Sequence, residues 1–221
     1  MSLFRKVHRH LDPGTTLAEL IFGLLMVLTF TLGARLLGPE EPTDGRELLI
    51  AAIGCNVAWG IIDGFLYVLG CVFERLRVVN VRESLRGARD DPAAVAVLQA
   101  ELGGGLADLG DPSHRIRFYA SIVAAARNEP GARPRLLPED LRGAVRVFFL
   151  VVATAVPAAL PFFVWDDAYT ALRVSNALLL ACLFVVGFLW GRHVGARPLF
   201  AGTLIMSIGV VLVLIAIPLG G

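Results

Sequence analysis

Five long stretches of apolar residues occur in this 221-residue chain, and they limit its fold more than any other feature. Each is close to the ~20 residues that a helix needs to cross the hydrocarbon core of a bilayer. Hydrophobic residues make up 56% of the chain, which is above the average for soluble domains. The sequence therefore predicts an all-α integral membrane protein with five transmembrane helices, at residues 17–37, 48–73, 147–165, 174–191 and 198–221.

The basic residues indicate which way the chain crosses the membrane. Arginine and lysine gather in the first 16 residues, in the segment 74–142 and in the turn 192–197, whereas the connections 38–47 and 166–173 are rich in acids. Loops that carry positive charge usually stay in the cytoplasm. We therefore expect a cytoplasmic N-terminus and an outside C-terminus. No apolar run with a cleavage site precedes the first stretch, so we expect a retained first helix, and the compact, arginine-dominated chain favours the inner membrane of a bacterium.

The predicted helices divide the chain into four parts: a basic cytoplasmic tail (1–16), transmembrane helices 1 and 2 (17–73), a cytoplasmic insert (74–142) and transmembrane helices 3 to 5 (143–221). Within the insert we expect two helices, at 92–109 and 112–128, with Asp91 and Asp111 as their N-caps. The insert is either a folded helical cap or a solvated linker that maintains topology.

Glu19 and Asp63 are the two acidic residues within the apolar stretches. An ionisable group inside a membrane costs roughly 2.5–3.5 kcal/mol on insertion scales, so such residues usually belong to an ion path or pair with a partner. Asn56, Gly60 and Gly64 share one helical face with Asp63. We expect function near the two acids, and we expect the glycines to permit close helix packing.

Helical rise gives a predicted depth for each candidate ligand. Met26 lies about 10 Å beyond Glu19, and Asp63 lies roughly 16 Å from Glu74, which marks the predicted cytoplasmic end of the second helix. The predicted order from the cytoplasm is Glu74 and Glu19, then Met26 level with Asp63. Together with Asn56 these residues form a candidate path for Fe²⁺ or Mn²⁺, since carboxylates and a thioether suit those ions better than Ca²⁺. The alternative is that Glu19 extends to the surface and Asp63 pairs with Asn56, Tyr67 or another helix.

Pro157 and Pro161 stand four residues apart in the third stretch. Proline removes a backbone donor and clashes with the preceding turn, so this pair predicts a kink or a local break in the helix. Broken helices occur at ion sites in transporters, although a kink that serves packing alone is also common.

Three segments resemble the vacuolar iron transporter family: ELIFGLLMVLT in the first stretch, VPAALPF in the third, and GFLWGRHVGARPLFAG between the last two. Glu19 and Gly23 stand in the places of the family's leading acid and glycine. Met26 and Val27 replace its Asp-Gly pair, and Asp63 lies in the second stretch, so acid and thioether have exchanged helices in this interpretation. The family's insert is rich in glutamate, whereas this one is rich in arginine.

The resemblance implies a homodimer that exports Fe²⁺ or Mn²⁺ from the cytoplasm, with coupling to protons or to another gradient, along a path near the first two helices. Asp63 then holds the ion midway, Met26 tunes selectivity, and Glu19 with Glu74 gathers ions or exchanges protons. The ion is the transported substrate, and no permanently bound cofactor is expected.

Two other functions remain open: a non-transporting membrane scaffold whose arginine-rich insert binds a partner or anionic lipid, and a passive cation channel. We do not expect an enzyme, because the chain contains no HExxH, GxSxG or GxxxxGK[ST] motif. The expected partners are the lipid bilayer, the metal ion and a second copy of the chain, and no nucleic acid.

Overall fold

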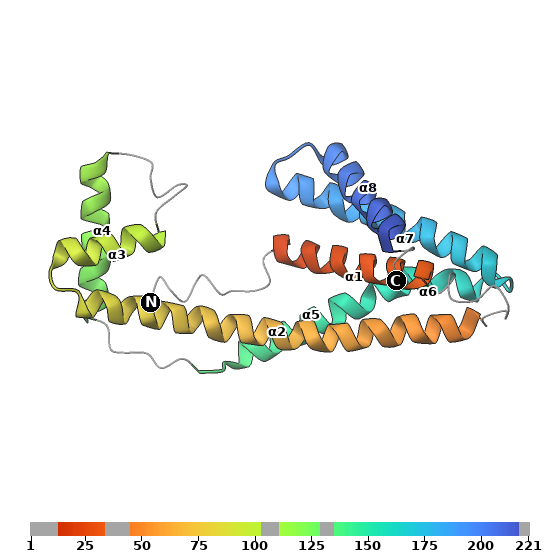
Figure 1. Cartoon of the computed structure of the whole chain (residues 1–221), viewed down its shortest axis with the longest axis horizontal. Coiled ribbons are helices and arrows are strands. Elements are labelled where there is room, and N and C mark those ends of the chain that lie inside the picture. Colours follow the sequence, from red (N-terminus) through yellow and green to blue (C-terminus); the bar gives the residue numbers. More distant parts are fainter. Residues whose placement is uncertain (1–12, 34–44, 103–110, 129–134, 217–221) are drawn as a thin grey trace. The chain divides into compact units, whose positions relative to one another are not determined.

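The computed structural model describes residues 13–33, 45–102, 111–128 and 135–216, and all regular elements in these ranges are helices (Figure 1). The first 12 residues of the predicted basic tail, most of the acidic connection 38–47, the end of the first predicted insert helix (103–109) and the last five residues lie outside the described residues. The elements in chain order are α1 (Pro13–Gly33), α2 (Gly45–Gly87), α3 (Asp91–Leu102), α4 (Pro112–Asn128), α5 (Pro138–Ala153), α6 (Ala155–Ala159), the 3₁₀ turn η3 (Leu160–Phe163), α7 (Ala168–Val194) and α8 (Pro198–Ala216).

Within the described ranges, four helical segments are long and apolar enough to cross a membrane: Pro13–Thr31, Leu49–Gly87, Pro138–Phe163 and Ala168–Val194. They confirm the prediction of an all-helical chain of the membrane type. The fifth predicted stretch forms α8, in which Pro198–Leu212 is an apolar helical segment shorter than these four. The fifth crossing therefore stays a prediction.

The chain divides into two compact units, which we call the bundle unit (Met1–Tyr67 with Pro138–Gly221) and the insert unit (Val68–Leu137). Helix α2 contributes to both, because it continues without a break to Gly87, well past the end of the predicted second span at Phe73. Helix α5 likewise begins at Pro138, ahead of the predicted start of the third stretch.

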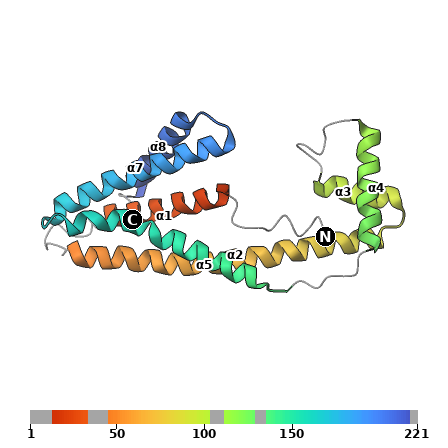
Figure 2. The same cartoon turned by 180° about the vertical axis from the view of Figure 1, so that it is seen from behind.

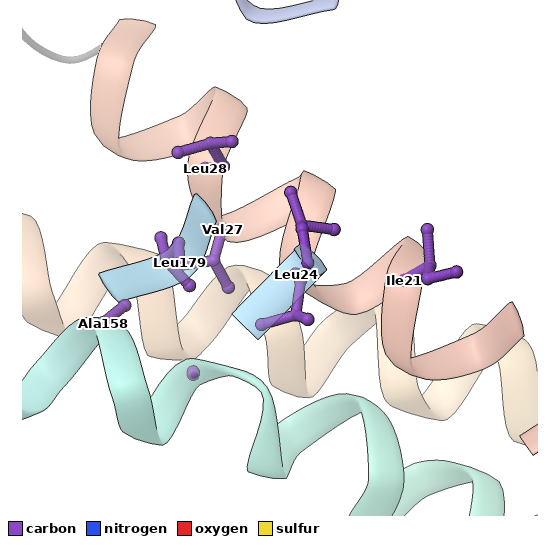
Figure 3. Close-up of a cluster of buried hydrophobic side chains, with 8 residues drawn as sticks. Ile21, Leu24, Val27, Leu28, Ala158 and Leu179 are labelled. Carbon is purple, nitrogen blue, oxygen red and sulfur yellow. The ribbon is translucent and has the colours of Figure 1, made fainter. Parts of the chain in front are cut away.

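The core of the bundle unit is made by aliphatic side chains of α1, α6 and α7 (Figure 3). Val27 and Leu28 of α1 and Leu179 of α7 are fully buried there. The remaining core residues are Ile21, Leu24, Ala155, Ala158 and Leu183. Helix α8 lies beside α7, as both views show (Figures 1 and 2). The two helices approach closely because Gly187, Gly191 and Gly202 carry no side chain at the contact.

Helix α2 packs against α5 through the predicted glycine face. A Cβ atom on Gly60 would lie 3.1 Å from the Phe148 carbonyl oxygen, and one on Gly64 would lie 3.1 Å from the Ala144 carbonyl oxygen. On the α5 side, Gly143 leaves room for the ring of Tyr67. The small residues thus allow a close helix–helix contact within the chain, as expected for a GxxxG face.

The proline pair breaks the third apolar stretch, as predicted. Helix α5 ends at Ala153, Thr154 lies outside both helices, and α6 is followed by a 3₁₀ turn that contains Pro161. Pro157 cannot donate to the carbonyl of Ala153, and its ring clashes with that carbonyl, so the helix breaks just before it.

The insert unit has its own small core, formed where α3 and α4 pack against the end of α2. Its buried members are Leu85, Ala94, Val95, Leu98, Tyr119 and Val123. Helix α4 has the predicted bounds, and α3 begins at Asp91. Ion pairs join Arg77 to Glu101 (2.6 Å) and Arg127 to Asp91 (2.7 Å).

The two predicted N-caps of the insert have different outcomes. The Ser113 amide donates to Asp111 Oδ1 at 2.7 Å, so Asp111 caps α4 as predicted, and hydrogen bonding by Ser113 lowers the pKa of that carboxyl. Asp91 was the wrong cap for α3. The Ala93 amide donates to Asp90 instead, at 2.8 Å, because the helix begins one residue earlier than predicted and Asp91 is drawn to Arg127.

Candidate functional site

Glu19 of α1 and Asp63 of α2 lie close enough for their carboxyl groups to interact electrostatically. Both side chains are half-buried in the bundle unit, within segments that are apolar enough to cross a membrane. Of the five predicted ligands, these two carboxylates are the pair that the structure brings together.

The contact between α1 and α2 determines which residue of α1 lies beside Asp63. Next to the two acids, the Phe22 ring packs edge-on against Trp59, with ring centroids 5.8 Å apart. Phe22 follows Glu19 in α1, whereas its partner Trp59 precedes Asp63 in α2. The two helices therefore run antiparallel. Asp63 lies opposite Glu19 and not level with Met26, which corrects the predicted order.

Met26 lies about two helical turns beyond Glu19 along α1. It is seven residues beyond Glu19, and Asn56 is seven residues before Asp63, so each is about 10 Å along its helix from the acid pair. Met26 is half-buried, and its carbonyl accepts a hydrogen bond from the Thr29 hydroxyl at 2.9 Å. The thioether and the Asp63 carboxylate thus occupy different levels.

Asp63 carries an unsatisfied polar atom. Its Oδ2 is buried and has no hydrogen-bond partner among the described residues. Leaving a buried acceptor unpaired costs roughly 1–3 kcal/mol, and more when the group is charged. Such an atom is a candidate ligand for a cation or for a hydrogen-bond donor.

Asn56, on the same face of α2, also carries a buried polar atom without a hydrogen-bond partner in the described ranges, and the residue is 1% exposed. Its Nδ2 donates to the Val151 carbonyl at 3.0 Å and to Thr154 Oγ1 at 2.9 Å. Its Oδ1 is buried without a partner in the described part of the chain. Both amide hydrogens are therefore used, which removes Asn56 as a donor to Asp63, one of the alternatives that the sequence left open.

The helix break explains why Asn56 binds there. The Thr154 hydroxyl donates to the Val151 carbonyl at 2.6 Å, and that carbonyl is also reachable by the Asn56 amide because α5 ends two residues later. Gly23 allows α1 to come near, since a Cβ there would lie 2.5 Å from Thr154 Oγ1. The sequence analysis did not identify Thr154. Its nearest signal was the proline pair, which predicts a break without indicating which carbonyl is freed.

Glu74 is exposed and lies on the part of α2 that belongs to the insert unit. Its charge acts on Arg77, one turn along the same helix. Glu74 thus belongs to the insert unit, whereas Glu19, Asp63 and Asn56 belong to the bundle unit.

The groups at the site are hydrogen-bond acceptors: two carboxylates on neighbouring helices, and an amide oxygen whose nitrogen is already committed. This arrangement suits a cation with a preference for oxygen ligands. Among the described residues, no cluster of three or more His, Cys, Asp or Glu side chains is present. The resemblance to the vacuolar iron transporter family rests on sequence segments alone, since neither the known protein-family models nor the curated proteins contain a match to this chain.

Proposed function

We propose that this protein transports divalent transition-metal cations across a membrane, along a polar path between α1 and α2. The observation that carries the proposal is the Glu19–Asp63 pair, with its buried and unpartnered Asp63 Oδ2, inside helices of membrane-spanning length. In this proposal α8 is the fifth span and the insert unit lies in the cytoplasm of a bacterial cell. The N-terminus is then inside and the C-terminus outside.

The carboxylate pair supports coupling to protons. Two like charges close together in a partly desolvated place repel each other, and this repulsion is relieved when either a divalent cation or protons bind. Loading with one therefore displaces the other. A pair of this kind supplies the elements of an exchanger that exports a metal ion and admits protons.

The ligand chemistry favours Mn²⁺ as the first ion to test. With Met26 at another position along the helix, the two ligand groups that lie together are the carboxylates of Glu19 and Asp63, and carboxylate oxygens suit Mn²⁺ better than softer ions. Fe²⁺ is the second choice, and the resemblance to the vacuolar iron transporters supports it. That resemblance also suggests a homodimer.

Flux measurements on the purified full-length protein in liposomes test the proposal. We expect Mn²⁺ movement above that of protein-free vesicles, and we expect a pH gradient to accelerate it severalfold. Flux that is indifferent to the gradient indicates the passive channel. An absence of both Mn²⁺ and Fe²⁺ flux from correctly folded protein overturns the proposal in favour of a membrane scaffold.

A further inference from the structure

Among the described residues, the contacts of the Asn56 side chain leave only its amide oxygen without a hydrogen-bond partner. A carbonyl oxygen accepts hydrogen bonds and never donates, so the amide group facing Val151 must be the NH₂ end. Thr154 Oγ1 uses its own hydrogen on the same carbonyl, at 2.6 Å, and therefore accepts from Asn56. These two contacts use both amide hydrogens.

The orientation of this amide thus follows from its partners. If the amide were flipped, Oδ1 would face the Val151 carbonyl, and two acceptors would repel each other in a buried place. The unpartnered Oδ1 can accept from a donor or coordinate a cation, and it cannot bind an anion.

We infer that Thr154 is a positioning residue that fixes the Asn56 amide as a neutral oxygen ligand for the transported cation, one step along the path from the Glu19–Asp63 pair. This inference rests on the proposed transport function. Asn56 and Asp63 are seven residues apart on one face of α2, so an ion that follows this face passes the carboxylates and then the amide oxygen.

A neutral ligand after a charged pair suits a transport path. An oxygen without formal charge binds a cation more weakly than two carboxylates do, so an ion that leaves the pair is stabilised again without being trapped. Loss of the Thr154 hydroxyl frees one N–H of Asn56. A buried and unpaired N–H beside the path repels the cation, and the amide loses part of its fixed position.

Transport kinetics with three variants of the full-length protein test this role. Thr154→Val keeps the size of the side chain and removes the hydroxyl, and we expect the KM for Mn²⁺ to rise about tenfold, with a smaller change in kcat. Thr154→Ser restores the hydroxyl, and its KM is expected to stay within about threefold of the parent.

Ser175→Ala is the matched control. Ser175 is fully buried, and its hydroxyl donates to the Ala158 carbonyl at 2.9 Å on the same broken segment, in a hydrogen bond that does not involve Asn56. This variant loses a comparable hydrogen bond, and we expect its KM to be unchanged within about twofold. Thr154→Cys, which keeps a weak donor and acceptor in a similar volume, replaces Thr154→Val if the latter does not fold, with an intermediate KM expected.

The outcomes separate this inference from the transport function itself. A correctly folded parent protein that moves neither Mn²⁺ nor Fe²⁺ refutes the proposed function. A parent that transports while Thr154→Val keeps its KM refutes the positioning role alone. An equal KM increase in Thr154→Ser and Thr154→Val also refutes it, because the cause is then the shape of residue 154 and not its hydroxyl.

Discussion

Replacing Asp63 with asparagine is expected to reduce gradient-driven Mn²⁺ flux to the level of protein-free vesicles. The change removes one charge of the Glu19–Asp63 pair and substitutes an amide that brings two donors to a place where acceptors gather. The cation then loses one of its two carboxylate ligands, so we expect a loss of flux of at least about 100-fold, or roughly 2.7 kcal/mol. The measurement is the initial rate of Mn²⁺ uptake at equal reconstitution.

Asp166→Asn provides the control for this loss. Asp166 is an exposed acid in the turn before α7, outside the segments of membrane-spanning length, and its replacement removes the same charge. We expect its flux to equal that of the parent. If Asp63→Asn and Asp166→Asn both retain parental flux, the ion does not pass Asp63.

Replacing Gly64 with leucine is expected to destabilise the bundle unit by about 1–3 kcal/mol, the usual cost of overpacking. The first added atom would already lie 3.1 Å from the Ala144 carbonyl oxygen, which belongs to the α5 backbone and cannot rotate away. The helices must separate, and Asn56 then loses its contacts with α5. Thermal unfolding of the purified protein in detergent measures the effect, as a lower Tm.

Gly54→Leu is the matched substitution on the same helix. Gly54 is exposed, and a Cβ there would meet no atom within 4 Å. Leucine also has a higher helix propensity than glycine, so we expect an unchanged or slightly higher Tm. Equal Tm values for Gly54→Leu and Gly64→Leu contradict the close packing of α2 on α5.

The local features of the fold were predictable from the sequence because they depend on neighbouring residues. Apolar length predicted the long helices, the position of Asp111 predicted the start of α4, and the proline pair predicted the break after Ala153. Asp91 shows the limit of such reasoning. A distant residue, Arg127, binds it, and the cap role passes to Asp90.

The level of Asp63 could not be predicted from helix lengths alone. Counting back from Glu74 assumed that α2 leaves the membrane there, whereas the helix continues to Gly87. The register of α1 and α2 is instead set by side-chain packing, visible in the contact between Phe22 and Trp59. Glu19 and Asp63 were predicted as important, but their proximity depends on this packing.

Thr154 was beyond prediction for a related reason. An isolated threonine before a proline has many roles, and its importance here comes from three partners on three helices. Val151 supplies a carbonyl near the end of α5, Asn56 reaches it from α2, and Gly23 allows α1 to approach. The contact with Val151 is local, but those with Asn56 and Gly23 are long-range and have no signature in the sequence around residue 154.

The central claim is that Glu19 and Asp63 act together on one cation, and equilibrium Mn²⁺ binding tests it most directly. Titration of the full-length parent, Glu19→Gln, Asp63→Asn and the double variant, followed by Mn²⁺ electron paramagnetic resonance, gives the four Kd values of a double-mutant cycle. We predict that each single change weakens binding at least about tenfold, and that the double variant is weakened by much less than the product of the two single effects. Parental Kd values in both single variants, or effects that multiply fully in the double variant, contradict a shared site.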